Sequence, residues 1–277
     1  MGIFNKVLLL TDLDGTLLDD ERRIGEKTRA AVEWFQSEGG LFSAATGRLH
    51  RFFHPDRENL PLNAPAVVSN GCYLYDYELR KGYGMIHVPK TAYAAVRAVH
   101  EQFSDVCMEL HAFKNTYVIG WNDISKRHLE IMEIQPIRIN DPAESLEPWI
   151  KVLFTVPKEQ ASALESFLRT NYPQYYYTFS TPNYFELMPL GVNKGDAALR
   201  LADLLGVDRK DLYCAGDHLN DISMIRVAAL GFAPENCHPE VRKVADRILP
   251  DNNHDAIAAL IECLSEKYGE KGCFLKK

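Results

Sequence analysis

Four short motifs, three of which contain aspartate, follow one another along this 277-residue chain. They read DLDGT at residues 12–16, TGR at 46–48, KGD at 194–196 and GDHLND at 216–221. Carboxylates bind hard divalent cations such as Mg²⁺, and a carboxylate can also attack phosphorus as a nucleophile. A lysine and backbone amides can neutralise phosphoryl oxygens. Each motif alone is weak, but their order predicts a Mg²⁺-dependent phosphoryl-transfer site.

The first motif follows the apolar run KVLLLT at residues 6–11. Such a run suits a strand that is buried on both faces of a parallel sheet. Asp12 and Asp14 then lie at the carboxyl end of the strand, where open α/β sheets place their ligands. Gly15 permits a tight bend and Thr16 can hydrogen-bond the new loop. On this string alone, the simpler interpretation that Asp and Gly merely end a strand has about equal weight.

The motif order resembles that of the haloacid dehalogenase (HAD) superfamily, and more narrowly that of Cof-type phosphatases with a type IIB cap. The resemblance covers nearly the whole chain and includes VSNG at 68–71 and NNHDAI at 252–257. It implies an α/β fold, in which a doubly wound parallel-sheet HAD-like (Rossmannoid) core carries an inserted α+β cap domain. It also implies phosphatase activity.

Three residues are predicted to be catalytic. Asp12 is the candidate nucleophile, because a carboxylate can form an aspartyl-phosphate and divide one difficult step into two. Asp14 is the candidate general acid and base, which would protonate the leaving oxygen and later activate water. Lys194 matches the third family motif, and its charge would neutralise the phosphoryl group and the Asp12 carboxylate. The solvated side chain usual for a lysine at a helix start is the alternative.

The predicted Mg²⁺ site follows the preference of this ion for oxygen ligands and for few protein carboxylates. Asp12 and Asp217 fit as direct ligands, and Asp221 fits either through a water molecule or by orienting Lys194. The resemblance adds the backbone carbonyl at Asp14. The full predicted set is Asp12, Leu13, Asp14, Asp217 and Asp221.

The predicted substrate-binding residues are Thr46, Gly47, Arg48, Lys194 and Asn220. Thr46 and the Gly47 amide would bind phosphoryl oxygens at the start of a helix, although a helix N-cap is the commoner use of such a threonine. Arg48 could contact substrate or form a salt bridge, with equal weight. Asn220 matches a family position that contacts phosphate.

Several further features carry less specific predictions. His50 and His54 could face together on a helix after Thr46, but no third metal ligand is evident. The tyrosines at 175–177 could stack on a base, although their strand-like alternation favours sheet packing. His218 could line the entrance. The string APENC at 233–237 replaces the family's usual Met-Gly-Asn-Ala string, so the geometry of that loop is open while Asn236 persists.

Bulk composition narrows the class of protein. The hydrophobic fraction of 46% and charged fraction of 25% are ordinary for a soluble globular chain. A net charge of −7 argues against nonspecific nucleic-acid binding. The N-terminal apolar run is too short for a membrane span or a secretory signal. The six cysteines form no C-x-x-C pair, so a cytoplasmic protein with reduced thiols is expected.

Strand and helix signals alternate at both ends of the chain, where we expect a strand at 66–69, a helix at 194–205 and a strand at 212–215, whereas the middle holds paired short strands with helices. We therefore expect a core at residues 1–81 and 190–277, interrupted by the cap at 82–189. The leading hypothesis is a phosphatase of small phosphorylated metabolites, most favourably sugar phosphates. A phosphomutase and a non-catalytic metabolite-binding regulator are the alternatives. Monomer and homodimer both remain open.

Overall fold

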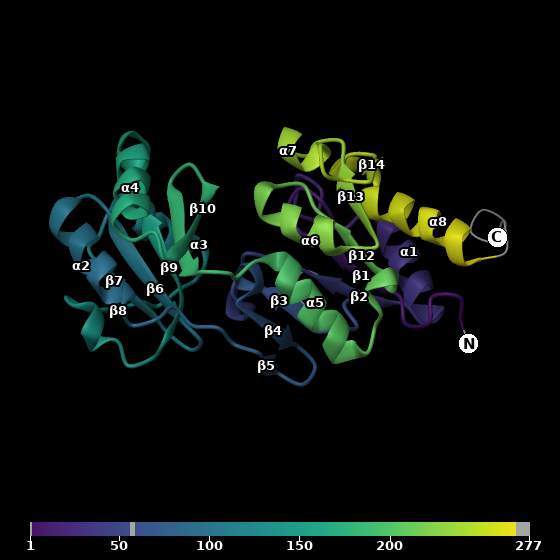
Figure 1. Cartoon of the computed structure of the whole chain (residues 1–277), viewed down its shortest axis with the longest axis horizontal. Coiled ribbons are helices and arrows are strands. Elements are labelled where there is room, and N and C mark those ends of the chain that lie inside the picture. The colour runs from purple at the N-terminus through teal and green to yellow at the C-terminus, as the bar shows by residue number, and fades with distance from the viewer. Residues whose placement is uncertain (1, 56–58, 270–277) are drawn as a thin grey trace. The chain divides into compact units, whose positions relative to one another are not determined.

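The computed structural model describes residues 2–55 and 59–269 (Figure 1). The chain divides into two compact units, which we describe separately. The first combines Met1–Gly84 with Asn193–Lys277, and the second is the insert Met85–Val192. Within the described ranges, no helix is both long enough and apolar enough to cross a membrane.

The first unit is built on a five-stranded, all-parallel sheet with the order β14-β13-β12-β1-β2. Its central strand β1 is buried throughout, as the apolar run predicts, and pairs with β12 on one side and β2 on the other. The carboxyl ends of β1 and β12 therefore lie side by side and deliver the first and fourth motifs to one edge of the sheet. The strands are β1 (Leu8–Thr11), β2 (Leu41–Ala44), β12 (Leu212–Ala215), β13 (Leu230–Pro234) and β14 (Arg247–Leu249).

Helices lie on both faces of this sheet (Figure 1). Leu8 and Leu10 of β1 pack in one cluster with Ala197 and Leu201 of α5 and with Met224 of α6. The helices α1 and α8 contact each other extensively. The helices of this unit are α1 (Glu26–Ser37), α5 (Lys194–Leu205), α6 (Ile222–Val227), α7 (Pro239–Arg242) and α8 (Ala256–Tyr268). The predicted doubly wound α/β core is confirmed.

A small antiparallel sheet in the first unit has the order β3-β4-β5, with β3 at Ala66–Val68, β4 at Tyr73–Asp76 and β5 at Lys81–Tyr83. The sequence predicts the segment at 66–69 as a further core strand. Instead, β3 meets the main sheet only through the single bridge Ala45–Val67. Because β5 pairs with β4, the unit extends to Gly84, past the expected boundary at residue 81.

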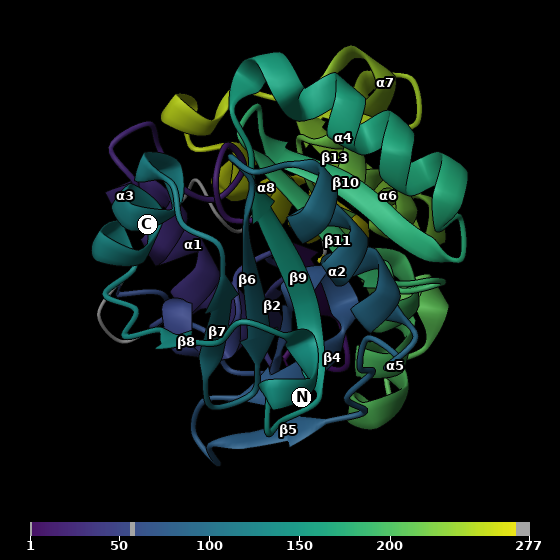
Figure 2. The same cartoon turned by 90° about the vertical axis from the view of Figure 1, so that its left-hand side faces the viewer.

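The second unit has a six-stranded sheet with the order β10-β11-β9-β6-β7-β8. All its pairs are antiparallel except β7 with β8. Figure 2 shows α2 and α4 running across these strands. The strands are β6 (Cys107–Ala112), β7 (Thr116–Ile119), β8 (Ile137–Arg138), β9 (Trp149–Thr155), β10 (Tyr175–Thr181) and β11 (Tyr184–Pro189). The helices are α2 (Ala92–Gln102), α3 (Asp123–Ile131) and α4 (Lys158–Asn171).

The two faces of the insert sheet differ in chemistry. Alternate residues such as Met108 and Phe154 pack with Val96 of α2 and Leu164 of α4 in an apolar core. The side chains between them include charged residues, and α3 lies on that face, where His128 contacts Glu109. Tyr175 and Tyr177 are buried in the apolar core, so the prediction that this tyrosine run serves sheet packing is confirmed.

The close packing of α6 on β13 provides a test of the core. An added Cβ at Gly231 would lie 2.5 Å from Ile225 Cγ2 and 2.6 Å from the Ile225 carbonyl oxygen, so the helix would have to shift. We expect Gly231→Ala to lower the free energy of unfolding by about 2–3 kcal/mol. Gly206→Ala is the control, because Gly206 has open space around it and only its φ of +66° costs energy, about 1–2 kcal/mol. Equal losses of thermal stability in the two variants would contradict this account.

Candidate active site

A buried lysine joins two aspartates at the carboxyl edge of the parallel sheet. Lys194 Nζ donates to Asp12 Oδ1 at 2.5 Å and to Asp221 Oδ1 at 2.6 Å. The Lys194 and Asp221 side chains have no exposed surface, and that of Asp12 is 13% exposed. Asp12 directly follows β1, Lys194 opens α5 and Asp221 opens α6. Three of the four motifs therefore meet in one ion cluster, although they lie far apart in sequence.

Local structure fixes each member of this cluster. Asn193 caps α5 by accepting a hydrogen bond from the Asp196 amide at 2.8 Å, which places Lys194 at the first helical position. The Asp12 amide donates to the Ala215 carbonyl at 2.9 Å and so ties the first motif to β12. Asp221 Oδ2 accepts from the amides of Asp217 and His218, at 3.0 and 2.9 Å. Both oxygens of Asp221 are thus engaged, which suits a positioning role.

Asp217 completes a group of three carboxylates. One oxygen from each of Asp12, Asp217 and Asp221 lies within 4.8 Å of the others, and this is the single such metal-ligand grouping within residues 2–55 and 59–269. Thr16 Oγ1 donates to Asp217 Oδ1 at 2.9 Å. Gly15, with a φ of +85°, passes so close that an added Cβ would lie 2.8 Å from Asp217 Oδ2. An oxygen donor set of this kind fits a hard divalent cation.

Burial dominates the ionisation of this cluster. It raises the pKa of Asp12 above its ordinary value, against the opposing charge of Lys194. Burial, aided by the Asp221 charge, raises the pKa of Asp217 to about 6. Burial alone would lower the pKa of Lys194, but the Asp12 and Asp221 carboxylates outweigh it and keep the ammonium charged. The site therefore has excess negative charge that a bound cation would offset.

Asp14 lies apart from the buried cluster and is half-exposed. Its two carboxylate oxygens accept from Arg48 Nη2 at 2.7 and 2.8 Å. Of the two roles left open for Arg48, the structure shows the salt bridge, and that bridge holds the first and second motifs together. An exposed ion pair of this kind contributes little to stability, so its geometry matters more than its energy.

The second motif follows β2, but the prediction that a helix starts at this motif is wrong. Thr46 Oγ1 accepts from the Arg48 amide at 3.1 Å in a hydroxyl-stabilised turn, and the next helical segment is the 3₁₀ turn η1 at His50–Phe52. Gly47 therefore has no helix N-terminus to support it, and Thr46 is no helix cap. The backbone at Thr46 bonds instead to β3 and to the following loop, because its amide donates to Val67 and its carbonyl accepts from Asn70.

Asn220, from the fourth motif, lies beside this turn. Its Nδ2 donates to Asn70 Oδ1 at 3.0 Å. An added Cβ on Gly47 would lie 3.2 Å from the same Asn70 oxygen. The structure thus brings Thr46, Gly47 and Asn220 together around Asn70, a residue to which the sequence analysis gave no role.

Three other predictions fare differently. The Leu13 side chain is buried and its carbonyl accepts the amides of Thr16, Leu17 and Leu18, and its place among the cation ligands stays a prediction. His50 Nδ1 contacts the Tyr73 hydroxyl at 2.7 Å, while His54 is exposed and lies outside η1. Burial lowers the pKa of His50 to about 4. His218 is exposed, and its ring meets that of His238 at 5.8 Å.

Two asparagines that the sequence analysis assigned to no site support the Asp14 loop. Asn236 Nδ2 donates to the Gly15 carbonyl at 2.8 Å, and Asn236 Oδ1 accepts from the Asn252 amide at 3.1 Å. The buried Asn252 side chain donates to the Leu18 carbonyl at 3.0 Å. The loop at 233–237 therefore keeps its contact with the first motif despite its Pro and Glu residues. The sequence holds a signal for these two residues, because both asparagines lie in turns that directly follow parallel strands, where loops of the site are expected.

Comparison with known proteins identifies the family. The family model for haloacid dehalogenase-like hydrolases matches residues 9–261. The chain belongs to the haloacid dehalogenase-like hydrolases. The family resemblance, the fold class and the prediction of a hydrolase are thereby confirmed.

Curated relatives of this HAD-like hydrolase carry the names of phosphatases. A 5-amino-6-(5-phospho-D-ribitylamino)uracil phosphatase from Bacillus subtilis, YcsE, is 27% identical and covers 92% of this chain and 94% of its own. The pyridoxal phosphate phosphatase YbhA of Escherichia coli is 26% identical over 92% of this chain and 97% of its own. Their names agree with the predicted class of phosphoric monoester hydrolases.

Solved structures agree on the fold. A haloacid dehalogenase-like hydrolase from Bacteroides thetaiotaomicron superposes with a TM-score of 0.81 at 22% identity, over 93% of this chain and 99% of its own. The HAD subclass IIB sugar phosphatase BT4131 gives a TM-score of 0.81 at 21% identity, over 94% of this chain and 99% of its own. At this level of identity the likeness establishes the fold alone.

The raised pKa of Asp217 predicts a pH effect on stability. Between its ordinary value of 3.8 and about 6, the folded, cation-free protein holds a proton that the unfolded chain releases. The free energy of unfolding of the wild type should therefore fall relative to that of Asp217→Asn as pH rises through this window, by about 1–3 kcal/mol. Denaturant titrations in chelator measure it, with the exposed Asp208→Asn as control. If the difference in free energy of unfolding between wild type and Asp217→Asn stays constant with pH, the raised pKa of Asp217 is refuted.

Proposed function

We propose that this hydrolase is a Mg²⁺-dependent phosphatase of small phosphorylated metabolites that works through an aspartyl-phosphate on Asp12. The observation that carries the proposal is the buried contact of Lys194 with Asp12 and Asp221 beside Asp217. Burying this much charge is costly unless the groups are used together. Transfer of a phosphoryl group requires a nucleophilic carboxylate, a fixed positive charge such as the Lys194 ammonium, and carboxylates suited to bind Mg²⁺.

The roles of the residues follow from their positions. Asp12 would attack phosphorus and form a bond to it as the ester oxygen leaves, and Asp14 would give that oxygen its proton. Asp14 would then take a proton from water, which attacks the phosphoryl group and releases inorganic phosphate and the free Asp12 carboxylate. Lys194 would offset the phosphoryl charge throughout. Asp12, Asp217 and the Asp14 carbonyl would hold Mg²⁺, which would supply electrostatic stabilisation of the phosphoryl oxygens.

The salt bridge between Arg48 and Asp14 has a consequence for this scheme. Arg48 Nη2 contacts both carboxylate oxygens of Asp14, the atoms that would have to pass a proton to the leaving oxygen. We infer that the substrate phosphoryl group draws Arg48 away from Asp14. Arg48 would then form the salt bridge with Asp14 before substrate binds, and would contact the substrate afterwards.

Sugar phosphates are the favoured substrates, with nucleotide and cofactor phosphates next. The names of the similar proteins support phosphorylated small molecules as the substrate class. They do not single out one substrate, because they cover a phosphoribitylamino-uracil, pyridoxal phosphate and a sugar. The polar face of the insert sheet is the part of this chain that we assign to substrate choice.

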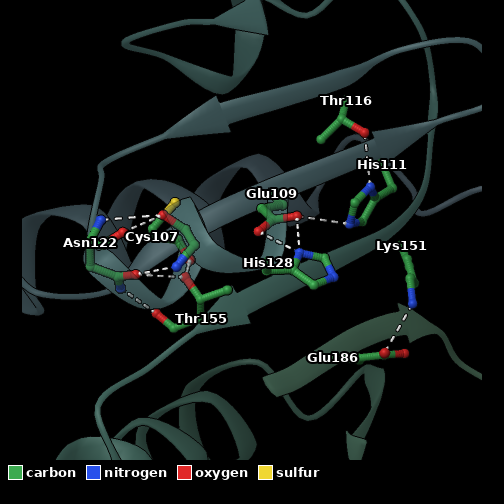
Figure 3. A network of polar contacts seen from close by, with 10 residues as sticks. Cys107, Glu109, His111, Thr116, Asn122, His128, Lys151, Thr155 and Glu186 are labelled. Atoms are coloured by element: carbon green, nitrogen blue, oxygen red, sulfur yellow. Dashed lines mark hydrogen bonds and ion pairs between the residues drawn. The ribbon is translucent and has the colours of Figure 1, made fainter. Parts of the chain in front are cut away.

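Glu109 of β6 is the centre of that polar face (Figure 3). It is fully buried and contacts His128 Nδ1 at 2.9 Å and His111 Nε2 at 3.4 Å. Burial alone would raise the pKa of Glu109, but the hydrogen bonds from the two histidines outweigh it and keep the pKa low. Burial lowers the pKa of His111 to about 4, so His111 is neutral near pH 7. A fixed anion thus lies next to two imidazoles.

Lys151 and Glu186 form a second buried pair on this face, with Lys151 Nζ 2.9 Å from Glu186 Oε1. Lys151 pairs directly with His111 in the sheet register, so the two polar groups adjoin. An apolar surface would serve stability as well or better. We infer that these donors and acceptors are retained to bind hydroxyl groups of the substrate beyond its phosphate, which suits a polyol.

Paired substitutions test the two catalytic aspartates. Asp12→Asn should abolish turnover of every phosphate ester, because an amide is a poor nucleophile and a weak cation ligand. Asp14→Asn should lower kcat by about 10²–10⁴-fold on alkyl phosphates and much less on esters whose leaving group needs no proton. Steady-state kinetics with Mg²⁺, with EDTA and after Mg²⁺ is returned measures both. The assignment fails if Asp12→Asn keeps activity within about tenfold of wild type.

A cap substitution tests substrate choice. Lys151→Met should change the order of kcat/KM across a panel of phosphorylated metabolites by about tenfold or more, because a hydrogen-bonding charged group is lost. Hydrolysis of a small activated ester should stay within about threefold, since that substrate has no hydroxyls to bind. Arg97→Met is the matched control, because Arg97 forms an exposed ion pair with Asp141 in the same unit. An unchanged order in Lys151→Met would place specificity elsewhere.

A further inference from the structure

The turn η2 at Ser69–Gly71 has an unusual backbone. Ser69, Asn70 and Gly71 follow one another with φ values of 50°, 54° and 100°. The left-handed region costs an L-residue roughly 1–2 kcal/mol, and consecutive residues there are rare. All three residues are buried. A buried, strained turn persists only where its surroundings hold it, and such turns cluster at functional sites.

The turn is tied to the second motif. The Ser69 amide donates to the Arg48 carbonyl at 2.9 Å, and the Asn70 amide donates to the Thr46 carbonyl at 3.0 Å. The left-handed backbone at Asn70 turns its carboxamide against Gly47, close enough that a Cβ on Gly47 would lie 3.2 Å from the Asn70 oxygen. Asn70 therefore defines one wall of the turn that we assign to phosphoryl binding.

The same turn packs against the start of α5. An added Cβ at Gly71 would lie 2.3 Å from the carbonyl oxygen of Asn193, the residue before Lys194. Arg200 of the same helix donates to the Gly71 carbonyl. The turn thus contacts the second motif and the helix that begins at Lys194, and Asn70 reaches the fourth motif through Asn220 at 3.0 Å.

We propose that Asn70 is a positioning residue that fixes the Asn220 carboxamide for phosphoryl binding, an inference that rests on the proposed function. An isolated carboxamide can present either its oxygen or its NH₂ group to an anion, and only the NH₂ group binds one. The Asn70 oxygen can only accept, so it selects the orientation in which Asn220 Nδ2 points into the shared turn. This nitrogen carries two hydrogens, and the second can serve a phosphoryl oxygen.

The test uses glycine in place of asparagine. Asn70→Gly removes the carboxamide but permits a φ of 54°, so backbone strain is not the variable. Asn59→Gly is the matched control, because Asn59 is exposed and has the same φ of 54°. With Mg²⁺ present, we expect Asn70→Gly to weaken inorganic phosphate binding by about tenfold, which corresponds to the loss of one hydrogen bond. The KM for a small phosphate ester should rise by about the same factor. Asn59→Gly should change neither value.

A double-mutant cycle shows whether Asn70 acts through Asn220. In the Asn220→Ala background, Asn70→Gly should weaken phosphate binding by less than about twofold, because the group that it orients is gone. Additive losses, or phosphate binding in Asn70→Gly equal to that of Asn59→Gly, would overturn the proposal. If the wild type binds phosphate with this coupling but hydrolyses no ester, the proposed function fails and the inference stands. If the wild type hydrolyses esters but shows no coupling between Asn70 and Asn220, the inference fails and the proposed function stands.

Discussion

The interaction on which the rest of the structure depends is the buried contact of one lysine with two aspartates. Lys194 has no exposed surface, and its ammonium is held at 2.5 Å from Asp12 and 2.6 Å from Asp221. Removal of Lys194 would leave two aspartates without their counter-charge in a poorly solvated place, which typically costs about 3–5 kcal/mol. The three residues come from separate βα connections, so the cluster is possible only when the parallel sheet is complete and in register.

The tight backbone around the cluster follows from the same constraint. Gly15 and Gly216 both lie where a side chain would strike an aspartate, at 2.8 Å from Asp217 Oδ2 and 2.4 Å from Asp221 Cβ. Asparagines then hold the surrounding loops: Asn70 joins the second and fourth motifs, and Asn236 donates to the Gly15 carbonyl. Neutral carboxamides suit this task, because they supply donors and acceptors without adding charge to a site that already has an excess of negative charge.

The sequence predicted the parts of this arrangement that depend on local patterns. The apolar run before Asp12 specified a buried strand, and the helix at 194–205 and the strand at 212–215 were placed at the bounds that the structure shows. What failed depends on tertiary context. Thr46 was expected to precede a helix, but the backbone there bonds to β3 and to Asn70 instead. The strings around Asn70, Asn236 and Asn252 indicated turns but not the contacts of these side chains, because their partners lie far away in sequence.

The most direct test of the central claim is the stereochemical course at phosphorus. A thiophosphate ester made chiral at phosphorus with two oxygen isotopes would be hydrolysed by the wild-type enzyme with Mg²⁺ in water that carries the third isotope, and the configuration of the released inorganic thiophosphate determined. A phosphoryl group carried by Asp12 undergoes two in-line displacements, first to the carboxylate and then to water. The account therefore predicts net retention of configuration. Inversion would show a single direct attack by water and would contradict the nucleophilic role of Asp12.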